Sequence, residues 1–124
     1  LLALEHARAI AECFRSKLVL VHAFPHTSDL RDSIEYNNLV ALRTKGGQAI
    51  IETARKQLGR TSIEVDEDLL EGPAAEAILS AAAIRNSDLI VMGSRGMGAL
   101  KGMVFGSVST KVFHYAPCPV MVVR

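Results

Sequence analysis

The chain has 124 residues and a formal net charge of +1 at pH 7, with 49% hydrophobic and 22% charged residues. That length predicts a single domain over residues 1–124 with a true hydrophobic core. The near-neutral charge and the aromatic content of only 5% remove the usual electrostatic and stacking arguments for a nucleic-acid or acidic-membrane partner.

The N-terminal part of the chain predicts a helix, a strand and a loop. Residues 1–14 place apolar side chains on one face at helical spacing. Residues 18–24, LVLVHAF, contain a continuous apolar run and stop before Pro25, which is typical of a strand buried on both faces. His22 in this strand is interpreted as a core or rim histidine rather than a catalyst. Residues 26–38 are polar and irregular and predict a loop.

The middle of the chain predicts a long helix followed by an edge strand. Apolar residues recur at helical spacing over residues 39–58, although Gly46 and Gly47 should each cost this helix roughly 1 kcal/mol relative to alanine. Residues 63–66 alternate apolar and acidic side chains, as in a half-exposed strand at the edge of a sheet. The acidic residues within 64–68 are accordingly interpreted as a solvated strand edge and turn.

The C-terminal half continues the alternation of helix and strand. An alanine-rich helix is predicted over residues 74–86, directly after Pro73, and a short buried strand over residues 88–93. A glycine-rich loop follows, then a helix over residues 107–115 and a last strand at residues 120–123. This alternation predicts an α/β fold with an open, mostly parallel sheet and helices on both faces.

The glycine-rich loop, GSRGMGALKGMVFGS at residues 93–107, is the main candidate for a binding site. Ligands of open α/β sheets bind beyond the carboxyl ends of strands, and Gly93 is expected at such an end. The helix that begins near Ser107 would present free N–H groups and the positive end of its dipole to a phosphate. Ser107 could also act as the N-cap of that helix. A flexible surface loop without a ligand is the alternative interpretation.

The glycine spacing separates this loop from the two commonest phosphate-binding loops. Lys101 is followed by Gly102, which excludes a Walker A loop, and GMGALKG does not have the Rossmann spacing. The pattern is instead G-x2-G-x9-G-S, formed by Gly93, Gly96, Gly106 and Ser107. With this pattern and the APCPVMVV ending, the chain resembles the nucleotide-binding members of the universal stress protein family. The upstream segments also occur in the order of that family, so the resemblance covers essentially the whole chain.

The resemblance implies an adenine-nucleotide site at the matching positions. Ala23 corresponds to a position that contacts adenine, and Met92 and Gly93 would lie near the ribose and the phosphates. The residues implied to hold the phosphates are Ser94, Arg95, Gly96, Gly106, Ser107, Val108 and Ser109. The implied ligand is ATP or another adenine nucleotide, with or without Mg²⁺. From the residues alone, Arg95 is as well explained as a solvated loop charge.

The same resemblance implies a five-stranded sheet of the adenine-nucleotide alpha hydrolase-like type. In that fold a central strand carrying an Asp precedes the first helix. The printed sequence starts with the helix at Leu1. We therefore expect the domain to be N-terminally incomplete, with the first strand missing and a gap in the sheet.

The last strand has an edge that a partner could cover. Its apolar residues are Val120, Met121, Val122 and Val123. Pairing with the same strand of a second copy would cover an exposed edge symmetrically, and the resemblance implies such homodimers. An ordinary edge strand without a partner is the alternative.

Three functions stay open at this point. The first is a cytoplasmic stress-response regulator that binds adenine nucleotide and acts on a protein partner. The others are a slow ATP hydrolase and a nucleotide-free dimeric scaffold. No catalytic residue is predicted, because no side chain is an evident base for orienting water. No His, Cys and carboxylate spacing predicts a metal site. Cys13 and Cys118 form no disulfide framework, which favours a reducing compartment.

Overall fold

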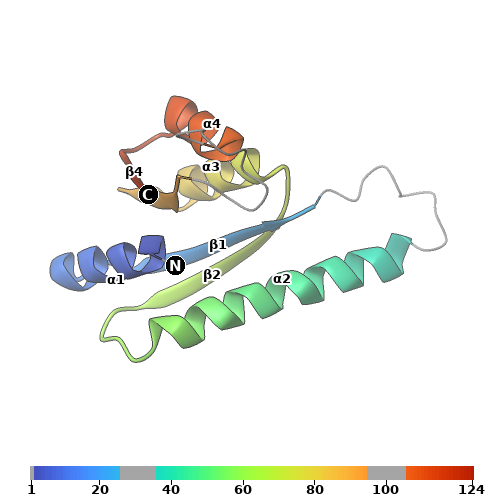
Figure 1. The fold of residues 1–124 in the computed structure, drawn as a ribbon, viewed down its shortest axis with the longest axis horizontal. Helices are drawn as coiled ribbons and strands as arrows, with labels where there is room; N and C mark the ends of the chain where they lie inside the picture. The colour runs from blue at the N-terminus through green and yellow to red at the C-terminus, as the bar shows by residue number, and fades with distance from the viewer. Residues whose placement is uncertain (1, 26–35, 95–105) are drawn as a thin grey trace.

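The computed structural model describes residues 2–25, 36–94 and 106–124, in which helices and strands alternate (Figure 1). In chain order the elements are α1 Leu2–Phe14, β1 Leu18–Phe24, α2 Tyr36–Leu58, β2 Val65–Glu71, α3 Ala74–Ile84, β3 Ile90–Gly93, α4 Ser107–Tyr115 and β4 Val120–Val123. The predicted order of elements is confirmed. The main differences are that α2 begins before Leu39 and that β2 begins after Ile63.

The strands form two separate parallel pairs. β1 pairs with β2 along the whole length of both strands, and β3 pairs with β4 in the same way. Among the described residues, no strand hydrogen-bonds to the second edge of β1 or of β3, so the two pairs are not joined by a ladder. The α/β class and the parallel direction within each pair are confirmed. The five-stranded sheet is represented by two two-stranded sheets, because no described strand supplies the backbone groups that would bridge them.

Helices lie on both sides of the β1–β2 pair. Figure 1 shows α2 below this pair and α3 above it, and both helices contact β1 and β2. α1 packs against β3 and β4, and α4 packs against α3 and β4. A buried cluster of Ala75, Ala82, Ile90 and Val112 joins α3, β3 and α4. The small alanine side chains let α3 approach closely, and this packing holds α4 beside the β3–β4 pair.

Gly47 has a packing role that the sequence pattern does not reveal. It is buried in α2, and a Cβ atom at this position would lie 2.6 Å from Leu69 Cδ1 and 3.4 Å from His22 Cδ2. Burial of the His22 imidazole against α2 lowers its pKa, in agreement with a core or rim histidine. Gly46 is exposed, and a Cβ atom there would meet nothing within 4 Å. Only one glycine of the pair is therefore needed for the close approach of helix and sheet.

Alanine substitutions should distinguish the two glycines. Gly46→Ala should raise the free energy of unfolding by about 0.5–1 kcal/mol, because alanine is the better helix former and the site is open. Gly47→Ala gains the same propensity but forces Leu69 to move, and overpacking typically costs about 1–3 kcal/mol. In urea denaturation, Gly47→Ala should be less stable than Gly46→Ala by about 1 kcal/mol or more. Equal stabilisation by the two substitutions would contradict the close contact of α2 with Leu69.

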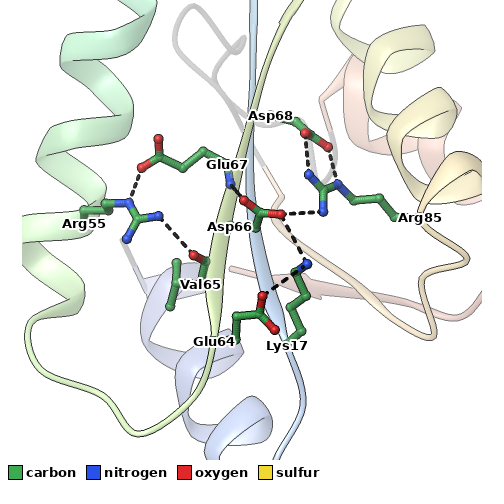
Figure 2. A network of polar contacts seen from close by, with 8 residues as sticks. All are labelled: Lys17, Arg55, Glu64, Val65, Asp66, Glu67, Asp68 and Arg85. Carbon is green, nitrogen blue, oxygen red and sulfur yellow. Dashed lines mark hydrogen bonds and ion pairs between the residues drawn. The ribbon is translucent and has the colours of Figure 1, made fainter.

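Acidic side chains of β2 are paired with basic side chains from other elements (Figure 2). Arg85, just after α3, donates to both carboxylate oxygens of Asp68 at 2.6 and 2.7 Å and to Asp66 at 2.9 Å. Lys17, which precedes β1, contacts the same Asp66 oxygen at 3.2 Å. The interpretation of residues 64–68 as a solvated edge is thus incomplete, because ion pairs attach this strand to α3 and to the start of β1.

Protonation of Asp66 should weaken the fold at low pH. Hydrogen bonds from Arg85 first, and then from Lys17, hold the pKa of Asp66 at about 2, below its ordinary value of 3.8. The folded state therefore favours the ionised carboxylate. Its stabilising contribution is complete above the unfolded-state pKa and is lost as the pH falls from about 4 to about 2.

Denaturation at a series of pH values from about 5 to about 2 tests this expectation. Asp66→Asn should lose less unfolding free energy over that range than the wild type. Glu64→Gln is the matched control, since it removes a neighbouring carboxylate that contacts the same Lys17 at 3.6 Å and leaves the hydrogen bond from Arg85 to Asp66 in place. Identical slopes for Asp66→Asn and the wild type would contradict the role of Asp66.

Candidate functional site

The two described ends of the glycine-rich loop meet at Ser94 and Gly106. The N–H of Gly106 donates to the carbonyl oxygen of Ser94 at 2.7 Å, and the hydroxyl of Ser109 donates to the same oxygen at 3.0 Å. The N–H of Ser94 donates to the carbonyl oxygen of Val123 at 2.8 Å, which extends the β3–β4 ladder beyond Gly93. The end of β3, the start of α4 and the end of β4 therefore converge on Ser94.

The start of α4 has the features of an anion-binding helix terminus. Gly106 is the N-cap, with φ −77° and ψ 170°, and no side chain caps the helix. The N–H of Thr110 donates to the Gly106 carbonyl at 3.0 Å, so the amides of residues 107–109 precede the helical hydrogen-bond ladder. No acidic side chain lies in the first turn. A negative group would therefore meet free N–H donors and the positive end of the dipole without repulsion from a carboxylate.

Ser107 is the first residue of α4 and is exposed. The expectation that Ser107 could be the N-cap is wrong, because Gly106 occupies that position. The physical reason is that Gly106 has the extended backbone of a cap, whereas Ser107 is already helical. The Ser107 hydroxyl therefore lies at the exposed helix start and has no capping role.

Two of the predicted contact residues use their side chains in the core. Met92 and Val108 are half-buried and pack against the cluster that contains Ile90 and Val112. A ligand at this end of β3 would thus meet the main chain of Met92 and Val108 rather than their side chains. Gly93, the last residue of β3, is exposed. Arg95 and Gly96 lie outside the described residues.

Ala23 is not connected to this group by hydrogen bonds between described residues. It lies near the end of β1, opposite Leu70 of β2. The N–H of Gly72 donates to the carbonyl oxygen of Phe24 at 2.7 Å, and a Cβ atom at Gly72 would lie 3.9 Å from Ala23 Cβ. The described surroundings of Ala23 are therefore the ends of β1 and β2, and its contact with adenine stays a prediction.

Sequence reasoning did not find how the Ser109 side chain is used. The residue is 4% exposed, and its hydroxyl lies 3.0 Å from each of the Ser94 and Gly106 carbonyl oxygens. Serine hydroxyls in helices commonly bond to a carbonyl three or four residues earlier, which is the one sequence signal that was available. The second acceptor, Ser94, depends on the tertiary fold. The sequence likewise contains no signal that the carbonyl of Val123 accepts a hydrogen bond from the N–H of Ser94.

Other parts of the described structure offer fewer features for binding. A surface hollow of about 630 Å³ at the α2–β2 connection is bordered by Arg55 and Arg60 and contains none of the predicted site residues. Within residues 2–25, 36–94 and 106–124, no group of three or more His, Cys, Asp or Glu side chains could hold a metal ion. In the same ranges, no helix combines the length and the hydropathy needed to cross a membrane.

The sequence of this chain matches a known protein family and several curated proteins. The model of the Universal stress protein family matches residues 1–124. A universal stress protein from Thermus aquaticus is 37% identical over 118 residues, which cover 95% of this chain and 85% of the relative. Other curated relatives are matched over about half of their own length.

Solved structures with the same fold are also found. The structure of the hypothetical protein MJ0577 has a TM-score of 0.87 at 27% identity and covers 98% of this chain and 85% of its own. A universal stress protein crystallised in complex with cAMP has a TM-score of 0.74 at 25% identity. The match covers 98% of this chain and 86% of that protein. The family model, the Thermus relative and the shared fold lead to one conclusion: the chain belongs to the universal stress protein family.

Proposed function

We propose that this protein binds ATP or another adenine nucleotide and acts as a nucleotide-dependent regulator in a stress response. The observation that carries the proposal is the start of α4. A glycine forms its N-cap, no acidic side chain lies in its first turn, and it is hydrogen-bonded to the end of β3. The resemblance at the G-x2-G-x9-G-S pattern implies that this helix start corresponds to the phosphate position of the family's site. The cAMP complex of a related universal stress protein supports an adenine nucleotide as the class of ligand.

The residues at the helix start fit a phosphate group chemically. The amides of residues 107–109 would donate to phosphate oxygens, and the exposed Ser107 hydroxyl would add a further donor. Gly106 carries no side chain at the point where the ligand would approach. Gly93, Arg95 and Gly96 are proposed to complete the phosphate contacts, and Ala23 to contact adenine. Ser94 could contribute only its hydroxyl to the phosphates, because its N–H already donates to Val123. In this proposal, Mg²⁺ accompanies the polyphosphate as its counterion.

We also propose a homodimer formed through β4. The carbonyls of Pro119 and Val123 accept hydrogen bonds from Ile90 and Ser94, so they face β3. Because backbone groups alternate along a strand, the N–H and C=O groups of Val120 and Val122 point to the opposite edge. Among the described residues, β4 pairs with β3 alone. The same edge of a second copy would satisfy these groups by symmetric pairing.

Sedimentation velocity tests the dimer directly. The wild type should sediment as a dimer. Val122→Pro should shift it towards the monomer, because proline removes an outward N–H while leaving the donors that face β3 in place. Circular dichroism should show that the variant keeps its helices. A monomeric wild type, or a folded Val122→Pro that stays fully dimeric, would contradict this interface.

Substitution of Gly106 tests the nucleotide site. The dihedral angles of Gly106 are those of extended backbone, which valine adopts readily, so α4 should still form in Gly106→Val. The branched side chain would occupy the space where a phosphate approaches the helix. Calorimetric titration with ATP, AMP and cAMP should show that affinity for the preferred nucleotide falls by about tenfold or more, equivalent to about 1.4 kcal/mol.

Two comparisons complete this experiment. Gly106→Ala should give an intermediate loss of affinity, because its side chain is smaller. Identification of the nucleotide after incubation with the protein separates a binding protein from a slow hydrolase. Wild-type affinity in a folded Gly106→Val variant would contradict the proposed site.

A further inference from the structure

Ser94 carries backbone hydrogen bonds in two directions. Its N–H donates to Val123 at the end of β4, and its carbonyl accepts from Gly106 at the start of α4. These two groups flank a single Cα atom, so their directions are related only through the φ and ψ angles of Ser94. A movement of the Gly106 end that rotates the Ser94 carbonyl therefore changes the geometry of the bond to Val123 to the extent that rotation about the ψ angle of Ser94 does not absorb it.

The Ser109 hydroxyl stabilises this arrangement from inside the protein. Both Ser94 and Ser109 are nearly fully buried, with exposed fractions of 6% and 4%. The hydroxyl has one proton and two carbonyl oxygens within reach, those of Ser94 and Gly106, each at 3.0 Å. It thus connects Ser94, at one described end of the glycine-rich loop, with Gly106, the N-cap of α4 at the other. Removal of the hydroxyl would leave the buried Ser94 carbonyl with one donor fewer.

The hydroxyl of Thr110 can be compared with that of Ser109, because it lies at the same end of α4 but has no described bond to Ser94. Its Oγ1 donates to the Gly106 carbonyl at 2.9 Å, so it bonds to the same N-cap from the next position of the helix. It is exposed, and its described hydrogen bond does not reach Ser94. Thr110 is therefore a close internal control for the effect of Ser109.

We propose that Ser109 is a positioning residue that couples the nucleotide-binding end of α4 to the end of β4 through Ser94. This inference rests on the proposed function, because the ligand in question is the nucleotide held at Gly106 and Ser107. A phosphate that fixes the start of α4 also fixes the Gly106–Ser94–Ser109 contacts, and these in turn hold Ser94 against Val123. By linkage, order at the end of β4 must favour nucleotide binding to the same extent. Nucleotide bound at the start of α4 would thereby influence β4, through which we propose that the dimer forms.

Amide hydrogen exchange without nucleotide tests the positioning role. In Ser109→Ala, the Ser94 amide should exchange about tenfold faster than in the wild type. The reason is that the Ser109 hydroxyl no longer fixes Ser94 in the position from which its N–H donates to Val123. The amide of Ile90, which donates to Pro119 at the opposite end of the same strand pair, should keep its wild-type rate. Thr110→Ala should change neither rate. Equal acceleration at Ser94 and Ile90, or none at either, would overturn the positioning role.

The same measurement with ATP tests the coupling. Saturating ATP should slow exchange of the Ser94 amide in the wild type more than that of Ile90, and this difference should shrink in Ser109→Ala. ATP affinity should fall several-fold in Ser109→Ala and stay unchanged in Thr110→Ala. ATP that binds without slowing the Ser94 amide would overturn the coupling. If the wild type binds none of ATP, AMP and cAMP, the proposed function and the coupling to nucleotide fail together, while the nucleotide-free arm still decides whether Ser109 positions Ser94.

Discussion

The carbonyl oxygen of Ser94 accepts the N–H of Gly106 at 2.7 Å and the hydroxyl of Ser109 at 3.0 Å, and the geometry of the candidate site depends on these two contacts. They hold the N-terminus of α4 at the end of β3, where a ligand of an open α/β sheet is expected. Packing of Val108 and Val112 in the core holds the body of α4 in place. The polar contacts join its first residues directly to the end of β3, and burial from solvent strengthens them.

The strands β2 and β4 differ in the charge that they present at their unpaired edges. β2 carries carboxylates held by basic side chains: Arg85 and Lys17 contact Asp66, and Arg55 of α2 pairs with Glu67 (Figure 2). Charged side chains on an edge strand disfavour pairing with another strand. β4 consists of three valines and a methionine and has no charge of its own. The chemistry of the two strands therefore favours β4 over β2 as the edge at which a second copy would pair.

Local patterns predicted most elements of this fold, and tertiary contacts account for what was missed. α4 and β4 have the predicted bounds, because glycine and proline residues punctuate that part of the sequence. The start of α2 at Tyr36 was missed, since the polar residues there show no apolar period. Gly47 was interpreted as a helix defect because its neighbour Leu69 lies in another element. At the site, the motif predicted which end of α4 matters, whereas the role of the Ser109 hydroxyl required the position of Ser94.

The small side chains of α3 determine which substitutions the fold tolerates. Ala75, Ala77, Ala81 and Ala82 are all buried in this one helix, and α3 contacts β1, β2 and α4. A larger side chain at these positions would overpack the helix against its neighbours and displace it. Because α4 packs against α3, such a displacement would also move the start of α4. Residues far from the glycine-rich loop therefore limit where a ligand of that loop can lie.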